Sequence, residues 1–372
     1  MRNPGLDLLR LLAVLLVMGR HLASPDGCGQ LTEGVFSPLI RGGWIGVDIF
    51  FVLSGFLISA LLFREYKTTG SINVPRFLIR RGLKIYPAYW CLLLPTIAFC
   101  FLNSRYAGVE LPTRKMIGEL LFMQNYLGSL WVHTWSLAIE EHFYIGFVVL
   151  LSVVGYFYRG LEWVPRLCTF TFVLCLALRL LVWQSTNGFN FDAQWTPTHL
   201  RIDSLMAGVL LSYAVHFYKL DQIMSRIPTW LFSVVGASLL IPAFISPQET
   251  TWWIPVFGFT LFYTGAMLLV YAAYRVGSLP RPLGILQSLG MRSYSIYLWH
   301  LPIASAITHH LLQLLHITNY WLYVTVYVAL SLAFGCWAAR LFEFPVLALR
   351  DRIFPAAQSL PATPIPAPQA VS

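Results

Sequence analysis

The sequence predicts an all-α fold, a polytopic bundle of transmembrane helices. Of its 372 residues, 57% are hydrophobic and only 11% are charged, a balance far outside that of soluble domains. Apolar windows of about 17–23 residues, the length needed to cross roughly 30 Å of hydrocarbon, recur along the chain. Lysine and arginine gather in alternate connections between these windows. Together these observations predict a chain embedded in a lipid bilayer.

Ten segments have the length and composition of membrane spans. They are residues 6–22, 44–63, 83–102, 137–158, 165–183, 202–218, 229–245, 253–274, 294–315 and 320–342. Residues 1–350 are therefore expected to form one membrane domain, followed by a Pro- and Ala-rich tail, residues 351–372, predicted to be disordered. The apolar run at residues 116–127 is too short to span and predicts an interfacial or re-entrant helix.

The distribution of basic residues predicts the orientation. With the N-terminus in the cytoplasm, most Lys and Arg residues fall in inner connections, as the positive-inside rule requires. The first inner connection alone carries Arg64, Lys67, Arg76, Arg80, Arg81 and Lys84. Because the number of spans is even, both termini are expected to be cytoplasmic. This bias accounts for most of the net charge of +9, so the basic composition does not indicate a nucleic-acid partner. None of the six cysteines has C-x-x-C spacing, and no metal is expected.

The first span carries Arg10 and His21, eleven residues apart. At about 100° and 1.5 Å per residue, these side chains share one helix face and lie roughly 16 Å apart along the axis. Ionisable residues inside a membrane indicate a functional site, here a cation at one depth and a titratable base at another. The structural alternative pairs Arg10 with Asp7, one turn back, and lets His21 simply end the span near the opposite interface.

Spans two and four add three acidic residues. Asp48 is expected at about the depth of His21, where it could fix the tautomer of the imidazole or stabilise its cation. The Ser54-Gly55 pair, in the same span, is typical of close helix packing. In span four, Glu140 and Glu141 do not fit the register of a capping box. Because successive residues point about 100° apart, only one can face a given site squarely, and Glu140 is the one expected to point inward.

The inner connection and the later spans hold the remaining polar candidates. Arg80, Arg81 and Lys84 predict a cytoplasmic anion site that clamps phosphates, unless they serve only topology or contact anionic lipid. His300, in span nine, is either catalytic or an ordinary buried histidine bonded to a backbone carbonyl. For Arg179 and Glu343 the default interpretation is a structural ion pair.

Several of these motifs occur in a recognisable order. Taken together, Arg10 to His21, the runs GVD (46–48), FFVLSGFL (50–57), Arg80-Arg81, WSLAIEEHFY (135–144) and YSIYLWH (294–300) resemble the acyltransferase 3 family of membrane O-acyltransferases over residues 5–350. In that family the arginine and histidine separated by ten residues are functionally essential, and an inner R-x-x-R motif is linked to the acyl donor. Here that motif reads Arg81-Gly82-Leu83-Lys84, with lysine in the second place.

The resemblance implies an enzyme. Such a protein would transfer an acyl group, commonly acetyl, from cytoplasmic acetyl-CoA to a hydroxyl of a glycan, lipid-linked sugar or small molecule at the outer side of a bacterial inner membrane. The residues fit that direction, because an inner basic cluster (Arg80, Arg81, Lys84) suits CoA phosphates. His21 would be general base or transient acyl carrier, oriented by Asp48 or Glu140, and Arg10 would position the donor or stabilise the oxyanion.

A transporter or flippase for a glycan precursor is the main alternative. Arginine, histidine and glutamate inside spans also serve ion and proton pathways. Against this alternative, no internal repeat of the kind that builds many transporters is visible in the sequence. A serine-hydrolase triad has little support, because the sequence contains no G-x-S-x-G elbow.

Overall fold

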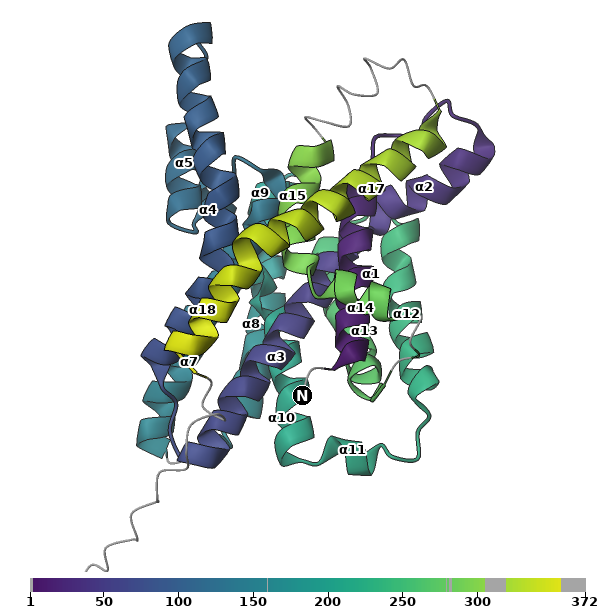
Figure 1. The fold of residues 1–372 in the computed structure, drawn as a ribbon. Coiled ribbons are helices and arrows are strands. Elements are labelled where there is room, and N and C mark those ends of the chain that lie inside the picture. Colours follow the sequence, from purple (N-terminus) through teal and green to yellow (C-terminus); the bar gives the residue numbers. More distant parts are fainter. Residues whose placement is uncertain (1–2, 159, 279, 281–282, 305–318, 356–372) are drawn as a thin grey trace, which may run out of the picture.

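The computed structural model describes residues 3–158, 160–278, 280, 283–304 and 319–355, and within these ranges all regular secondary structure is helical (Figure 1). This confirms the predicted all-α fold. The helices are α1 (Pro4–Arg20), α2 (Gln30–Gly42), α3 (Ile45–Thr69), α4 (Val74–Ala107), α5 (Thr113–Leu120), α6 (Gln124–Leu127), η1 (Val132–Thr134), α7 (Trp135–Tyr158), α8 (Val164–Ser185), α9 (Phe191–Gln194), α10 (Thr198–Phe217), α11 (Leu220–Ile223), α12 (Thr229–Ile245), η2 (Ile254–Gly258), α13 (Phe259–Tyr274), α14 (Gly284–Gly290), α15 (Ser293–Pro302), α17 (Tyr320–Ala338), η5 (Ala339–Glu343) and α18 (Phe344–Ile353).

Every predicted span overlaps at least one described helix. Among the described residues, seven helices are long and apolar enough to cross a bilayer: α3, α4, α7, α8, α10, α13 and α17 with their continuations. The protein is therefore an integral membrane protein. The first and seventh predicted spans correspond to α1 and α12, which have 17 residues each. The ninth is described only as far as residue 304. The count of ten and the cytoplasmic placement of both termini stay predictions.

Asparagine side chains begin four of the described helices. Asn3, Asn73, Asn190 and Asn319 each accept a hydrogen bond from the backbone N–H three residues further on, at 2.9–3.1 Å. Such an N-cap satisfies one of the N–H groups that have no partner within the helix. At α1 this cap fixes where the helix starts, and so fixes the positions of the polar residues that follow it.

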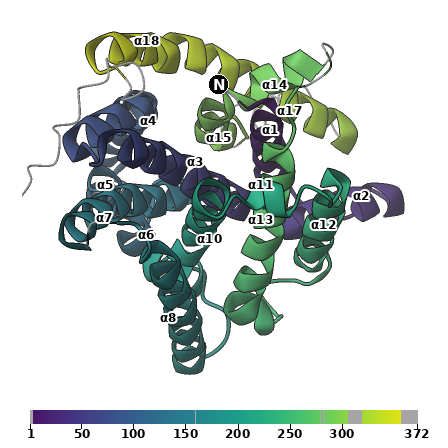
Figure 2. The same ribbon diagram turned by 90° about the horizontal axis from the view of Figure 1, so that it is seen from below.

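Helices α3 and α10 pack at the centre of the bundle through two glycines. A Cβ atom added at Gly55 would lie 1.9 Å from the Leu205 carbonyl oxygen, and one at Gly208 would lie 2.1 Å from the Val52 carbonyl oxygen. The two backbones therefore touch, as the Ser54-Gly55 pair predicted. In the most apolar window of α3, 78% of residues are buried, against 17% in α8, which projects from the bundle and faces lipid (Figure 2).

The structure differs from the sequence-based expectation at three connections. The first inner connection is mostly helical, because α3 continues to Thr69 and α4 begins at Val74, so Arg80, Arg81 and Lys84 lie on a helix. Residues 116–127 form parts of two short helices, α5 and α6, rather than one. Helix α18 includes residues 351–353 of the predicted tail, while residues 356–372 lie outside the described ranges.

Candidate active site

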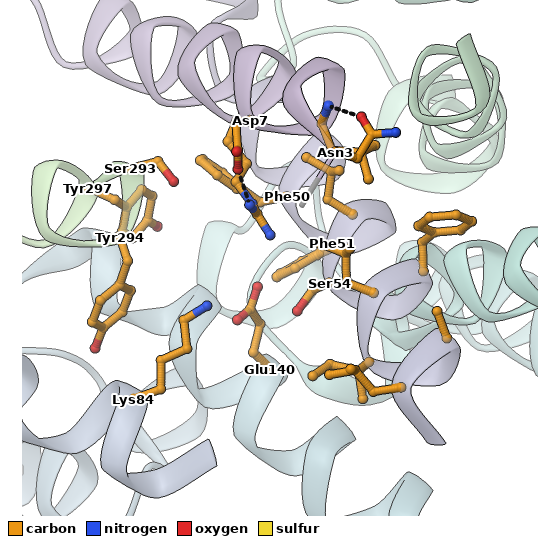
Figure 3. A pocket seen from close by; sticks show the side chains of 18 of the residues that line it. Asn3, Asp7, Phe50, Phe51, Ser54, Lys84, Glu140, Ser293, Tyr294 and Tyr297 are labelled. Atoms are coloured by element: carbon orange, nitrogen blue, oxygen red, sulfur yellow. Dashed lines mark hydrogen bonds and ion pairs between the residues drawn. The ribbon is translucent and has the colours of Figure 1, made fainter. Parts of the chain in front are cut away.

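A cavity of about 620 Å³ lies between α1, α3, α4, α7, α13 and α15 (Figure 3). Its volume falls in the range of small-molecule and cofactor sites, which is about 300–1,000 Å³. Apolar side chains of α3 form much of one wall. The charged residues that line it are four cations and two acids: Arg10, Arg64, Arg81, Lys84, Asp7 and Glu140. This excess of positive charge suits an anionic ligand.

Helix α1 presents Arg10 to the cavity. The Arg10 guanidinium donates to Asp7 Oδ1 at 2.6 Å, and the Asp7 carboxylate is fully buried. The pairing proposed as the structural alternative is therefore confirmed. It does not remove Arg10 from the site, because the side chain still lines the cavity and is 23% exposed. Asp7 instead holds the guanidinium in place.

Glu140 belongs to an arginine and tyrosine cluster. Its Oε2 atom lies 3.8 Å from Arg81 Nη2 and accepts a hydrogen bond from the Tyr144 hydroxyl at 2.5 Å. Arg81 donates to the same hydroxyl, and its guanidinium lies 4.0 Å from the centre of the Tyr144 ring. Ser54 Oγ, from α3, completes the cluster at 2.5 Å from that hydroxyl.

This position corrects the prediction that Glu140 orients His21. As expected, Glu140 is the glutamate that lines the cavity, whereas Glu141 accepts a hydrogen bond from Tyr86 at 3.1 Å. However, the hydrogen bonds of Glu140 lead to the basic residues of α4 and not to the imidazole. Ser136, whose hydroxyl contacts Tyr297, lies on the side of α7 nearer the histidines. Glu140 lies one helical turn further along α7, and this places its carboxylate beside Arg81.

The predicted phosphate clamp is divided by the helical geometry of α4. Arg81 and Lys84 are three residues apart, so they share a face and both line the cavity. Arg80 points elsewhere, donating to Asp351 Oδ1 at 2.9 Å and to the Phe354 carbonyl oxygen. Arg80 therefore ties α4 to the end of α18 and does not line this cavity, so its predicted contact with the donor stays a prediction.

Lys84 has a different environment from the arginines. Figure 3 shows its side chain extending from α4 into the cavity, with the ammonium nitrogen directed between Glu140 and Asp7. Among the described residues, no hydrogen bond or ion pair within 4.0 Å reaches this nitrogen. Its charge is therefore available for a ligand.

Asp48 is also placed differently from the prediction. Its carboxylate accepts hydrogen bonds from Arg201 at 2.8 Å and from Ser204 at 3.2 Å, both on α10. Asp48 and Arg201 are fully buried, and the Arg201 guanidinium lies 3.7 Å from the centre of the Phe259 ring. Within the described ranges, no hydrogen bond or ion pair joins Asp48 to His21, and Asp48 instead links α3 to α10. The same helix, α10, also holds the partner of Arg179, which forms the structural ion pair expected of it.

The partner of Arg179 is Asp203, the acidic residue of α10, and both side chains are buried. For Glu343, the described contact is a hydrogen bond of 2.8 Å from the Ser295 hydroxyl.

His21 follows α1 directly and lies in a group of three histidines. Its Nδ1 atom is 2.9 Å from the Val17 carbonyl oxygen and 3.2 Å from His300 Nε2. The His133 and His300 rings are also in contact, with centroids 5.1 Å apart. Because a carbonyl oxygen only accepts, Nδ1 of His21 carries the proton, which leaves a lone pair on Nε2. That nitrogen can take a proton from an alcohol.

Tyr297 connects the cavity to the histidine group. Tyr297 lines the cavity, and its ring contacts those of His133 and His300. Its hydroxyl lies 2.6 Å from Ser136 Oγ and donates to the His133 carbonyl oxygen at 2.8 Å. Arg10 thus lines the cavity, whereas His21 lies outside its lining, just past the other end of α1.

A family model described as an acyltransferase domain matches residues 3–340 of the chain. The chain belongs to the acyltransferase 3 family. The match covers the cavity, the histidine group and every residue of the predicted site.

Two relatives show what this acyltransferase 3 family member is similar to. A protein of Staphylococcus aureus (strain COL), named as a putative O-acetyltransferase, is 27% identical over 344 residues, covering 81% of this chain and 50% of the relative. The O-acetyltransferase OatA of Staphylococcus aureus (strain NCTC 8325 / PS 47) is 26% identical over 332 residues, covering 83% of this chain and 52% of OatA. The chain thus spans about half the length of the curated relatives it matches. No solved structure matches the chain.

The residues that the sequence singled out for this acyltransferase 3 family member are only partly assembled. Arg10, Arg81, Lys84 and Glu140 share the cavity, while His21 does not line it and contacts His300. Sequence reasoning missed His133 as a member of the histidine group, although it lies two residues before the recognised run 135–144. Within the described ranges, no group of three His, Cys, Asp or Glu side chains could hold a metal ion.

Proposed function

We propose that this protein transfers an acetyl group from acetyl-CoA to a hydroxyl of a glycan or related acceptor. One observation carries the proposal: a basic cavity large enough for a cofactor is connected to His21, whose Nε2 has a lone pair, through the contacts of Tyr297 with His300 and of His300 with His21. An anion site beside a base is what transfer from an acyl-CoA to an alcohol requires.

The chemistry balances with the residues present. The acceptor oxygen attacks the thioester carbonyl carbon while its proton passes to His21 Nε2. The C–O bond forms, the C–S bond breaks, and the CoA sulfur leaves as a thiol after taking a proton. Arg10, about 16 Å from His21 along the axis of α1, is placed to hold the donor in the cavity rather than the oxygen at which negative charge develops.

The positions of the cavity and of His21 support an inward-to-outward direction. Residues near the predicted cytoplasmic ends of α1 and α3, including Asn3 and Arg64, line the cavity. His21 lies at the opposite end of α1, about 16 Å from Arg10 along the axis. A donor that enters from the cytoplasm could therefore place its phosphates near Arg81 and Lys84 and extend its acyl end toward the outer side.

Membranes that contain the protein provide the test. They are given radiolabelled acetyl-CoA, and the label in lipid and glycan fractions is measured for the wild type, His21→Ala and His199→Ala. His199 is an exposed histidine that stacks on Tyr126, away from the cavity. We expect incorporation in the wild type and the His199 variant, and its loss in the His21 variant. Equal incorporation in all three proteins would contradict the role of His21, and absence of incorporation in the wild type would favour transport of a glycan precursor.

A further inference from the structure

We infer that His300 is the positioning residue of His21, holding its ring so that Nε2 faces the reacting hydroxyl. This inference rests on the proposed function and adds a residue to it. His300 lies 279 positions from His21 in the sequence, on α15, yet the two rings are in contact with centroids 5.1 Å apart. The His300 side chain is fully buried.

The direction of each hydrogen bond follows from the carbonyl groups at both ends of the pair. His300 Nδ1 lies 2.5 Å from the Tyr297 carbonyl oxygen, which can only accept, so this nitrogen carries the proton of a neutral ring. His300 Nε2 then has a lone pair. His21 Nδ1 carries a proton for the same reason, through Val17, and donates it to both acceptors. The two backbone carbonyls thus determine both tautomers.

This arrangement favours the proton transfer that the reaction needs. When His21 Nε2 takes the proton of the acceptor alcohol, its ring becomes a cation. The hydrogen bond from its Nδ1 to His300 Nε2 then becomes charge-assisted, a class roughly twice as strong as a bond between neutral groups. His300 therefore holds the neutral ring in place and stabilises the charged one, which is the work that a carboxylate performs in a catalytic triad.

The other candidates for this work are placed elsewhere. Asp48 bonds to Arg201, and Glu140 bonds to Tyr144 beside Arg81. His133 contacts the His300 ring, but its Nε2 lies 3.1 Å from the Leu298 carbonyl oxygen and it makes no hydrogen bond to His21. Among the described residues, His300 is therefore the one side chain that accepts from His21.

Two substitutions separate positioning from packing. His300→Gln keeps an oxygen acceptor near the position of Nε2, whereas His300→Phe keeps an aromatic ring of similar size without an acceptor. In membranes with saturating acceptor, kcat and the KM for acetyl-CoA are measured for both. We expect the Phe variant to lose about 10- to 100-fold in kcat, the effect of one charge-assisted hydrogen bond, with little change in KM. We expect the Gln variant to recover a large part of that loss.

The controls distinguish failure of this inference from failure of the proposed function. Radiolabelled CoA binding to each purified variant reports whether the cavity is still folded, because His300 does not line it. If the wild type is active and His21→Ala is inactive, but His300→Phe keeps full kcat, the inference is wrong and the proposed function stands. Equal losses in the Phe and Gln variants with CoA binding retained would also overturn the inference. A hydrogen-bond acceptor at position 300 would then make no difference to kcat. An inactive wild type would contradict the proposed function itself.

Discussion

Replacing Lys84 with methionine tests whether the cavity binds the phosphates of the donor. Methionine has a similar length and no charge, so the substitution removes the ammonium group with little change in volume. Arg10 and Arg81 keep their carboxylate partners, Asp7 and Glu140, whereas Lys84 has no ion-pair partner among the described residues. Its charge is therefore the one expected to be neutralised by a bound anion.

The magnitude follows from the interaction that is lost. A hydrogen bond to a charged group contributes about 1.5–3 kcal/mol, and every 1.4 kcal/mol changes an affinity about tenfold. We therefore expect the KM for acetyl-CoA to rise about 10- to 100-fold in Lys84→Met, with a smaller change in kcat because the lysine is remote from His21. Steady-state label transfer in membranes at varied acetyl-CoA measures both constants, and direct binding of radiolabelled CoA checks that KM reports affinity.

Arg80→Met is the matched control. Arg80 belongs to the same basic group of α4, but its hydrogen bonds lead to Asp351 and Phe354 and it does not line the cavity. We expect this variant to keep the wild-type KM. If Arg80→Met raised KM as much as Lys84→Met, the effect would come from the general charge of the inner face, and the assignment of the cavity would be refuted. An unchanged KM in Lys84→Met would refute it equally.

Three further predictions concern stability, measured as the thermal midpoint in detergent. Gly55→Ala places a Cβ 1.9 Å from a carbonyl oxygen of α10 and should destabilise by about 1–3 kcal/mol or more, whereas Gly146→Ala, with nothing within 4 Å, should not. Asp48→Asn leaves Arg201 buried without its counter-charge and should cost about 3–5 kcal/mol; an additional Arg201→Met should restore part of this, and no restoration would contradict the ion pair. Burial raises the pKa of Glu119, which lies outside the spans in α5, so its contribution to stability is present below its unfolded pKa and is lost as pH rises through the folded pKa. Glu119→Gln should therefore gain stability relative to the wild type between pH 4 and pH 8, and a constant difference would contradict the shift.

The membrane fold could be predicted because its signals are local. An apolar run long enough to cross hydrocarbon must form a helix whatever surrounds it, since no water is present to bond its backbone groups. Once the segment is helical, residues three apart lie on one face, so the sequence separation of Arg81 and Lys84 was enough to place both on one face of α4. Helix α2 was not predicted, because its 13 residues include glycine and proline and do not form a span.

The site could be predicted only in part, and Asp48 and Glu140 show why. Both were expected beside His21 because depth was counted from the ends of the apolar runs. In the structure Asp48 bonds to Arg201, 153 positions away, and Glu140 lies beside Arg81. The rotation of each helix, and a shift of one turn along its axis, decide such partners, and neither is encoded in the local sequence.

The sequence by itself determined that this protein is a helical membrane protein, which residues carry charge into the bilayer, and that Arg81 and Lys84 share a face. The tertiary structure decided the partner of each buried polar group: Arg201 for Asp48 and His300 for His21. The physical reason is that an apolar helix forms from its own backbone hydrogen bonds, whereas a buried charge or imidazole is satisfied only by whatever side chain the packing of distant helices brings to it.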